Sequence, residues 1–515
     1  MKKSIFYCGC IIAMFSWGTG CSKDIDEKHL SYPVLNPLKT DLDAGTWKTI
    51  LLTTPDEFAV PAPIATNNPA YIAELNEIKG WQTNLSDKQR DIISYWSAGG
   101  ILRWNEILRE LVAKHNLPPY QNEDGTYPVP NANNPFAYPV FPFANPPYAA
   151  RAYAYVSTAQ YDALVAAYHY KKLYNRSAPY KIDSVVKALV SKSDLPSYPS
   201  EDGAIVGVTV ELLKLLFPAD LAFIQQKADE HKLYRIMAGA NVRSELEAGE
   251  ALGKAVAQKF TARARTDRAG TAGGNAALWA QLEQQTAATG EIPWISFESP
   301  KRPPMLPLFG KVRTFLFDSA TLVSIRPPKP PSTSSPEFKK ELEEVAYYSK
   351  NPTRERMRIV HFWADGVNTS TPPGHWNAIA ADDFVKLQFS EVRWARNLAL
   401  LNMAMMDAAI ACWDAKYLYF NPRPSQVDRT IKTLTGLPNF PSYTSGHSTF
   451  SAAAASVLGH IIPSKAKEFT DMATEASLSR IYGAIHYRSD CEQGLKCGER
   501  VGSFAVARAK TDGAE

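Results

Sequence analysis

Three short segments near the C-terminal end of the chain carry side chains that could do chemistry. They are KYLYFNPRP, which begins at Lys416, TSGH, which ends at His447, and SRIYGAIHYRSD, which ends at Asp490. Lys416, Arg423 and Arg480 together supply three cations. An arginine fork matches the oxygens of a tetrahedral oxyanion, and a lysine adds a compact point charge. The segments therefore predict a pocket for a phosphate-like anion.

The same segments also supply a hydroxyl, backbone amides and two imidazoles. Ser445 and Gly446 directly precede a helical pattern, and free amides at the start of a helix bind anions well. Asp490 follows His486 by four residues, so we expect it on the same helical face, where it could hold one ring nitrogen. Of the two histidines, His447 and His486, one would be a nucleophile or ligand and the other an acid–base group.

The ordered set resembles the superfamily of type 2 phosphatidic acid phosphatases and vanadium-dependent haloperoxidases, whose pattern is K-x6-RP, then PSGH, then SR-x5-H-x3-D. The first and third segments match fully, and Thr444 replaces the proline of the second. The resemblance implies that the oxyanion is held by Lys416, Arg423, Ser445, Gly446 and Arg480. It also implies that His486 attacks phosphorus or coordinates vanadium, that His447 is the acid–base group, and that Asp490 orients His486.

Parts of the chain occur twice. Three blocks match in the same order, which indicates an internal repeat about 110 residues long. The pairs are RIMAGANVRSE at 235–245 with RIYGAIHYRSD at 480–490, ARAYAYVSTAQYDA at 150–163 with ARNLALLNMAMMDA at 395–408, and LPSYPS at 195–200 with LPNFPS at 437–442. The first two pairs are 245 residues apart and the third is 242 apart. In the first copy Asn241 replaces His486, and Arg235 is the one pocket candidate that is kept.

Apolar residues recur at three- and four-residue spacing in both copies, which is typical of helices. We predict an all-α fold of two helical bundles related by the internal repeat, with the active site in the C-terminal bundle. The predicted divisions are a signal peptide at 1–20, a tether and irregular lead-in at 21–90, a non-catalytic first repeat at 91–261, a proline-rich connection at 262–335 and the second repeat at 336–515.

The N-terminus reads as a targeting segment. Met1-Lys2-Lys3 is a basic start, Ile5 to Trp17 is an apolar run of about 13 residues, and the sequence before Cys21 resembles a bacterial lipobox. We expect Cys21 to be lipidated, with an ordinary secretory peptide as the alternative. No later run looks apolar enough to span a membrane. The chain is thus expected to be an exported lipoprotein of the bacterial cell envelope, periplasmic or on the outer-membrane surface, attached by its lipid alone.

Composition and cysteine use narrow the class of protein. Apolar residues make up 45% of the 515 residues, charged residues 21%, and the net charge is +4, which suits a soluble globular body. No basic run or zinc spacing points to nucleic acid, and the sequence leaves the oligomeric state open. Cys412, Cys491 and Cys497 should be buried apolar residues, because residues six apart on a helix diverge too far for a 491–497 disulfide.

The shared motif leaves the reaction open. Trp413 and Phe440 resemble the aromatic positions beside the halide site of chloroperoxidase-like members, although core packing explains them equally well. The segment FWADGVNTSTPPGHW resembles haloperoxidase-like sequences; it predicts a helix end and a loop at the pocket mouth, with Asp365 near an arginine and His375 at the entrance. The alternatives are a haloperoxidase with vanadate, halide and hydrogen peroxide, an acid phosphatase acting on phosphate esters without a cofactor, and a binding lipoprotein with a relic pocket.

Overall fold

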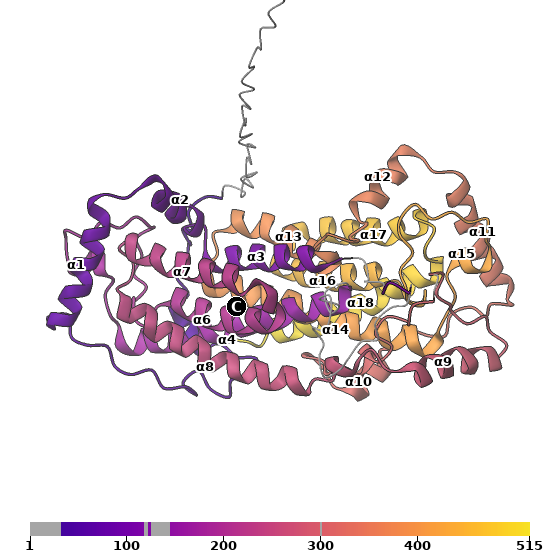
Figure 1. The fold of residues 1–515 in the computed structure, drawn as a ribbon, viewed down its shortest axis with the longest axis horizontal. Coiled ribbons are helices and arrows are strands. Elements are labelled where there is room, and N and C mark those ends of the chain that lie inside the picture. The colour runs from indigo at the N-terminus through magenta and orange to yellow at the C-terminus, as the bar shows by residue number, and fades with distance from the viewer. Residues whose placement is uncertain (1–31, 118–121, 125–144, 299–300) are drawn as a thin grey trace, which may run out of the picture.

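The computed structural model describes residues 32–117, 122–124, 145–298 and 301–515, so the predicted signal peptide and Cys21 lie outside the described residues. Every regular element in the described part is a helix (Figure 1). The first half contains α1 (Pro69–Thr83), α2 (Asp87–Trp96), α3 (Gly100–His115), α4 (Pro146–Tyr174), α5 (Pro179–Ile182), α6 (Glu201–Leu216), α7 (Leu221–Met237) and α8 (Arg243–Thr266).

Two helices lie in the connection between the halves, α9 (Ala276–Ala288) and α10 (Ser319–Ser324). The second half contains α11 (Pro336–Lys350), α12 (Arg354–Phe362), α13 (Thr371–Phe384), α14 (Glu391–Tyr419), α15 (Pro424–Val427), α16 (Gly446–Ile461), α17 (Ala466–Tyr482) and α18 (Arg488–Ala509). Short 3-10 turns are η1 (Leu42–Thr46), η3 (Pro218–Asp220), η4 (Ala269–Thr271), η5 (Phe309–Lys311), η6 (Val385–Leu387) and η7 (Pro463–Lys465).

Helices α4 and α14 form the centre of the molecule and pack against each other. Both begin at a polar cap, since Asn145 accepts a hydrogen bond from the amide of Tyr148 and Ser390 accepts one from Arg393. Their end residues, Asn175 and Phe420, take the left-handed conformation that closes many helices. Both are rich in alanine and buried on almost every side, so each half contributes to one continuous hydrophobic core.

The segment Glu391–Val427 corrects one expectation from the sequence. By length and composition alone it is apolar enough to cross a membrane, whereas no such run was expected after the N-terminus. Its apolar window is wholly buried inside the protein. The pattern therefore belongs to the central core helix α14, in which nearly every face contacts protein.

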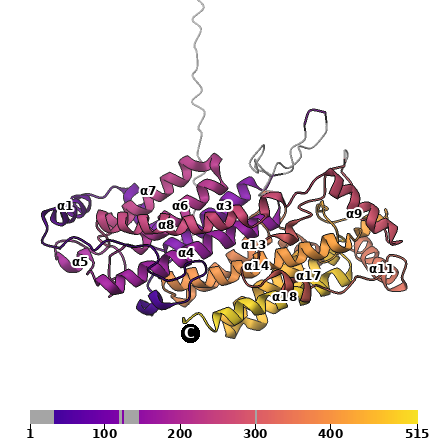
Figure 2. The same ribbon diagram turned by 90° about the horizontal axis from the view of Figure 1, so that it is seen from below.

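The two halves contain helices in the same order and of similar length. Helices α4 to α8 have 29, 4, 16, 17 and 24 residues, and α14 to α18 have 29, 4, 16, 17 and 22. Figures 1 and 2 place α6 to α8 at one end of the elongated molecule and α16 to α18 at the other. The helical spacing predicted in both copies is confirmed, since the blocks at 150–163 and 395–408 lie within α4 and α14.

The lead-in and the connection are more regular than predicted. Helix α1 and the start of α2 lie within 21–90, and α9 and α10 lie within 262–335. Asn68 caps α1 and is followed by Pro69 at the first helical position, while Ser86 and Gln89 form a capping box on α2. Proline is favoured at that first position, so it marked the start of a helix here and not an irregular segment.

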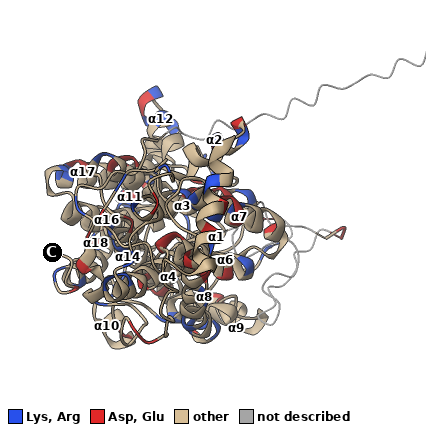
Figure 3. Ribbon diagram, turned by 90° about the vertical axis from the view of Figure 1, so that its left-hand side faces the viewer, with Lys and Arg blue, Asp and Glu red and all other residues tan. Residues whose placement is uncertain are grey.

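An ion pair and hydrogen bonds also connect α14 of the second half to the N-terminal part of the chain. Asp41, in the lead-in, pairs with Arg393 at the start of α14. Glu391 accepts hydrogen bonds from the amides of Gly100 and Ile101, the first residues of α3. Viewed from the end at which α1 lies, acidic and basic segments are interspersed among the helices (Figure 3). The free, buried state of Cys412, Cys491 and Cys497 confirms the expectation for these three cysteines.

Candidate active site

The motif residues meet where several helices of the second half begin or end. Lys416 lies in the last turn of α14, and Arg423 caps the start of α15. Arg480 lies in the last turn of α17, and Ser445 caps α16. Contacts among their side chains and the loops between these helices bring the three segments together, although they are distant in sequence.

Lys416 is fully buried and bonded to the loop that precedes α16. Its Nζ lies 2.8 Å from the carbonyl oxygen of Pro441, 2.9 Å from that of Ser442 and 2.5 Å from that of Thr444. Burial lowers the pKa of Lys416 to about 7. Three acceptors around one nitrogen require three donated protons, which only the ammonium form has. Lys416 is thus a buried cation with a pKa close to neutral pH.

Arg423 is the second buried cation and contacts the reactive histidine directly. Its Nε donates to the carbonyl oxygen of Phe440 at 3.0 Å, and its Nη1 donates to that of Ile485 at 2.8 Å. The same Nη1 lies 3.0 Å from His486 Nε2. Among the described residues Nη2 finds no hydrogen-bond partner, and burial lowers the pKa of Arg423 to about 10. An unpaired buried donor of this kind is costly unless a ligand accepts from it.

His486 is held by Asp490. Its Nδ1 lies 2.9 Å from Asp490 Oδ2, which also accepts from the Ser442 hydroxyl at 2.5 Å and the Tyr487 amide at 3.1 Å. Burial, followed by the charges of Arg423 and Lys416, lowers the pKa of His486 well below its ordinary value. The ring is therefore neutral, with its proton on Nδ1 and a lone pair on Nε2.

The helical-face argument for this pair is wrong, although the contact it predicted is present. His486 lies in the loop between α17 and α18, and α18 begins at Arg488. Asp490 occupies the third position of α18 and reaches back over the helix start. The pair is thus built at the start of α18, where the same carboxylate also accepts from the backbone amide of Tyr487.

Ser445 and Gly446 are placed as expected at the start of α16. The Ser445 hydroxyl accepts a hydrogen bond from the amide of Ser448, and the helix begins at Gly446. A β-carbon on Gly446 would meet only Phe450 at 3.8 Å and Trp413 at 3.9 Å. Packing does not require glycine here, so its small size instead leaves room beside the first amides of the helix, where an anion is favoured.

His447 and Asp365 form a second histidine–carboxylate pair near the cations. His447 Nε2 is buried without a hydrogen-bond partner among the described residues and is 3.8 Å from Asp365 Oδ2. Asp365 Oδ1 is 3.0 Å from His375 Nδ1, so the carboxylate lies between two imidazoles. Burial, then the charge of Arg480, lowers the pKa of His447 well below its ordinary value. Asp365 lies in the loop after α12, where its charge acts on Arg480, in agreement with the predicted arginine neighbour, and it also places a carboxylate beside His447.

Arg480 completes the set of cations. Burial lowers the pKa of Arg480 to about 10, and the Asp365 carboxylate opposes that shift. Its Nε donates to the Ser479 hydroxyl at 2.8 Å. Lys416, Arg423 and Arg480, which we call the cation cluster, therefore outnumber the carboxylates Asp365 and Asp490 close to them. The local excess of positive charge favours an anionic ligand.

Trp413 and Phe440 line the cation cluster. Their ring centroids are 5.0 Å apart, and Lys416 Nζ is 4.9 Å from the centroid of Phe440 and 5.7 Å from that of Trp413. Trp413 also donates its indole N–H to the carbonyl oxygen of Met305, which comes from the connection between the halves. The two rings pack in the core and also lie beside the site. Core packing and a position next to the predicted halide site are therefore compatible.

His375 lies in the first turns of α13, and α12 ends at Phe362, so only part of the predicted loop is irregular. The ring of His375 stacks on Trp363 at 4.7 Å, centroid to centroid. Sequence reasoning missed Ser442, whose hydroxyl supports Asp490. A signal was present, because PSYTS at 441–445 closely matches PSYPS at 196–200.

The lysines that contact these two segments also have matching positions. Lys171 Nζ donates to the carbonyl oxygen of Pro196 at 2.5 Å, as Lys416 Nζ donates to that of Pro441. Each lysine lies in the last turn of its long helix. The two acceptors are 245 residues apart, the spacing of the other two matched blocks, whereas the predicted alignment of this block has a spacing of 242. Lys171 is thus a second cation of the first half, beside Arg235, that has a counterpart in the second half.

The comparisons with known proteins agree with this geometry. Residues 397–512 match the family model described as the PAP2 superfamily. This region belongs to the PAP2 superfamily. It contains every motif residue from Lys416 to Asp490, and members of the superfamily are generally enzymes. A search of curated protein sequences found no match.

Solved structures extend the likeness beyond the PAP2 region. A bacterial vanadium-dependent iodoperoxidase is 24% identical with a TM-score of 0.57, over 79% of this chain and 96% of that chain. A bacterial vanadium-dependent chloroperoxidase in its holo form is 14% identical with a TM-score of 0.50, over 74% of this chain and 96% of that chain. These similarities show a haloperoxidase-like all-helical fold across both halves.

Proposed function

We propose that this chain is a vanadium-dependent haloperoxidase-type enzyme that oxidises halide with hydrogen peroxide. The observation that carries the proposal is the state of His486. Its ring is neutral, Asp490 holds Nδ1, and Nε2 faces Arg423 within the cation cluster. One imidazole lone pair surrounded by cationic donors suits a compact tetrahedral oxyanion such as vanadate.

The donor set fits vanadate on two further counts. Arg423 Nη2 and His447 Nε2 are buried without partners among the described residues, and oxyanion oxygens would satisfy both. When bound, vanadate would supply the centre at which peroxide is activated toward halide. Lys416, Arg423 and Arg480 would hold its oxygens together with the Ser445 hydroxyl and the Gly446 amide.

The chain's own groups have distinct tasks in this proposal. His486 binds through Nε2, and Asp490 keeps the proton on Nδ1. His447 takes up and returns protons at Nε2, beside the Asp365 carboxylate at 3.8 Å. Asp365 in turn contacts His375, which is partly exposed and could pass a proton toward solvent.

Two features favour halide oxidation over phosphate-ester hydrolysis. Trp413 and Phe440 form an aromatic wall beside Lys416, where a weakly hydrated halide could rest against the ring edges. The similarity to the iodoperoxidase covers most of both chains, including the first half of this one.

The second candidate is an exported acid phosphatase, favoured by the same unpaired Nε2 at His447. In that reaction His486 Nε2 would attack phosphorus while the bond from phosphorus to the ester oxygen breaks. His447 would give its proton to the departing alkoxide, and water would later release phosphate from His486. This route needs no cofactor. Because burial holds the pKa of His447 low, this general acid would lose its proton, and the step would slow, as the pH rises.

A parallel assay separates the two reactions. Purified protein is given vanadate, hydrogen peroxide and iodide, bromide or chloride in one series, and a chromogenic phosphate ester in the other. We expect halide oxidation that His486→Ala and Arg480→Ala abolish. Asn241→Ala, at the position in the first half that matches His486, is the control and should retain activity. Ester hydrolysis without halide oxidation would support the phosphatase, and inactivity in both series would leave the relic binding protein.

Two further proposals concern the whole chain. We propose that it consists of two copies of one helical unit, supported by the matched order and lengths of α4 to α8 and α14 to α18. We also propose an exported bacterial lipoprotein held at the cell envelope through Cys21, supported by the basic and apolar N-terminal pattern. Its partners would be small molecules and the membrane at that single anchor.

A further inference from the structure

The first half contains a counterpart of the cation cluster, and it is occupied by the protein itself. Lys171 lies in the last turn of α4, Ser200 caps α6, and Arg235 lies in the last turn of α7. Lys416, Ser445 and Arg480 hold the same places in α14, α16 and α17. We call Lys171, Ser200 and Arg235 the first-half cradle.

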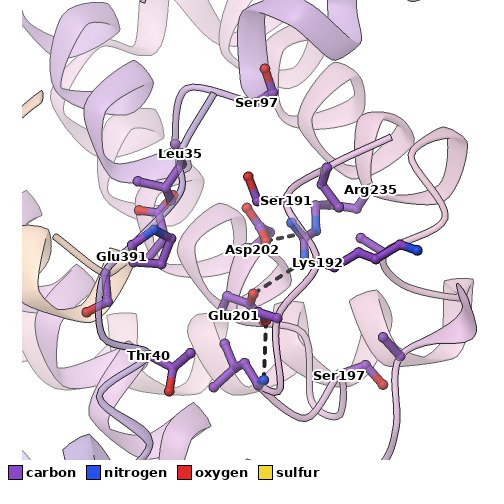
Figure 4. A pocket seen from close by; sticks show the side chains of 18 of the residues that line it. Leu35, Thr40, Ser97, Ser191, Lys192, Ser197, Glu201, Asp202, Arg235 and Glu391 are labelled. Carbon is purple, nitrogen blue, oxygen red and sulfur yellow. Dashed lines mark hydrogen bonds and ion pairs between the residues drawn. The ribbon is translucent and has the colours of Figure 1, made fainter. Parts of the chain in front are cut away.

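A glutamate stands where the second half has glycine. Glu201 is the first residue of α6, as Gly446 is the first residue of α16. Its Oε2 lies 2.6 Å from Lys171 Nζ. Its Oε1 lies 3.3 Å from Arg235 Nη2 (Figure 4). One carboxylate therefore bridges two cations at the start of a helix, which is the arrangement an external oxyanion would adopt.

Charge compensation separates the two sites. Burial alone would lower the pKa of Arg235, but Asp202 and Glu201 outweigh it and hold that pKa above its ordinary value. Asp202 Oδ2 is 2.9 Å from Arg235 Nε. In the second half, burial lowers the pKa of Arg480 to about 10. The cations of the first half are thus neutralised internally, whereas in the second half the nearby carboxylates do not outweigh burial.

We propose that Glu201 is a built-in replacement for a bound oxyanion, and that the first-half cradle is an anion site closed by its own carboxylate. Wild-type protein therefore binds one tetrahedral oxyanion per chain, in the second half. A cavity of about 330 Å³ is lined by Glu201, Asp202 and Arg235, so removing the Glu201 side chain opens the cradle to an existing space. Glycine at position 201 re-creates the arrangement around Gly446.

The test is calorimetric titration with inorganic phosphate, together with thermal melts. The wild-type chain is titrated as a reference, and every other chain carries Arg480→Ala, which weakens the second-half site. Adding Glu201→Gly should create a phosphate-binding event with one phosphate per chain and a phosphate-dependent rise in Tm. Adding Lys171→Met to that variant should remove the gain. Asp87→Gly is the matched control, because Asp87 also follows a capping serine but is exposed; it should gain nothing.

The outcomes are distinct. A folded Glu201→Gly chain whose titration equals that of its parent overturns the proposal. If this variant folds poorly, Glu201→Ala and expression with and without phosphate provide the second measurement. Phosphate-dependent recovery of folded protein supports the closed cradle, and equal insolubility in both media overturns it. Failure of the proposed function would appear separately, as wild-type protein that binds no phosphate while Glu201→Gly still gains a site.

Discussion

The bond pattern at Asp490 predicts different consequences for its asparagine and alanine variants. All three of its hydrogen bonds, from His486, Ser442 and Tyr487, end on Oδ2, and Oδ1 has no partner among the described residues. The carbonyl oxygen of an asparagine could therefore accept all three bonds, with its amide group at the Oδ1 position. Asp490→Asn should keep the His486 tautomer, while it loses the negative charge and leaves the new amide group without a partner.

The expected magnitudes follow from that difference. A hydrogen bond to a charged acceptor contributes about 1.5–3 kcal/mol and a neutral one about 0.5–1.5 kcal/mol, so Asp490→Asn weakens the His486 bond by about 1.4 kcal/mol, or about tenfold in activity. Asp490→Ala strands three buried donors. It should lower the free energy of unfolding by at least about 3 kcal/mol and reduce activity by about 100-fold, because His486 is then free to change its tautomer.

The assay is kcat/KM for the better substrate of the parallel assay, measured between pH 5 and pH 8, with denaturant unfolding alongside. Burial raises the pKa of Asp490 to about 6, so wild-type activity should fall as the pH drops through 6 and the carboxyl gains a proton. Asp490→Asn should lack that fall. Glu245→Gln is the control, since Glu245 accepts from Ser197, Asn241 and Val242 at the same position of α8. It should lose stability only.

Two results would refute this reasoning. If Asp490→Asn loses activity as completely as Asp490→Ala, the carbonyl oxygen does not preserve the tautomer. If Asp490→Ala remains fully active, the carboxylate does not position His486 at all. A fall in activity for Glu245→Gln equal to that of Asp490→Asn would instead attribute the effect to general loss of stability.

The remaining predictions test other parts of the site and the anchor. Because burial lowers the pKa of Lys416 to about 7, phosphate binding should take up a proton above that pH, so titrations from pH 6 to pH 9 should show affinity falling up to about tenfold per unit above 7. A flat profile would contradict a pKa near 7 for Lys416. Asp365→Asn should lower kcat about tenfold with little change in KM, because His447 loses its neighbouring carboxylate. His375→Gln should lower kcat less. Equal increases in KM for both variants would instead indicate that Asp365 and His375 bind substrate. Cys21→Ser should move the protein from membrane to soluble fractions, and retention through carbonate washing would count against the single anchor.

Much of the fold was predictable because local signals in this chain agree with one another. Alanine-rich apolar spacing predicted α4 and α14, and the small residues after Ser445 predicted the start of α16. The prolines of the lead-in misled the prediction, because the same residue that breaks a helix interior begins one at Pro69. The apolar run of α14 was missed as a candidate span, and only its burial assigns it to the core.

The sequence by itself determined which residue types form the site, because three ordered segments supply the cations, the histidines and the helix start that an oxyanion pocket needs. Only the tertiary structure decided how they are connected. It placed His486 in a loop, directed three bonds to one oxygen of Asp490, left Arg423 Nη2 unpaired and set Glu201 between Lys171 and Arg235. The physical reason is that helix caps and apolar spacing act over a few residues, whereas the compensation of buried charge depends on distances between segments far apart in the chain.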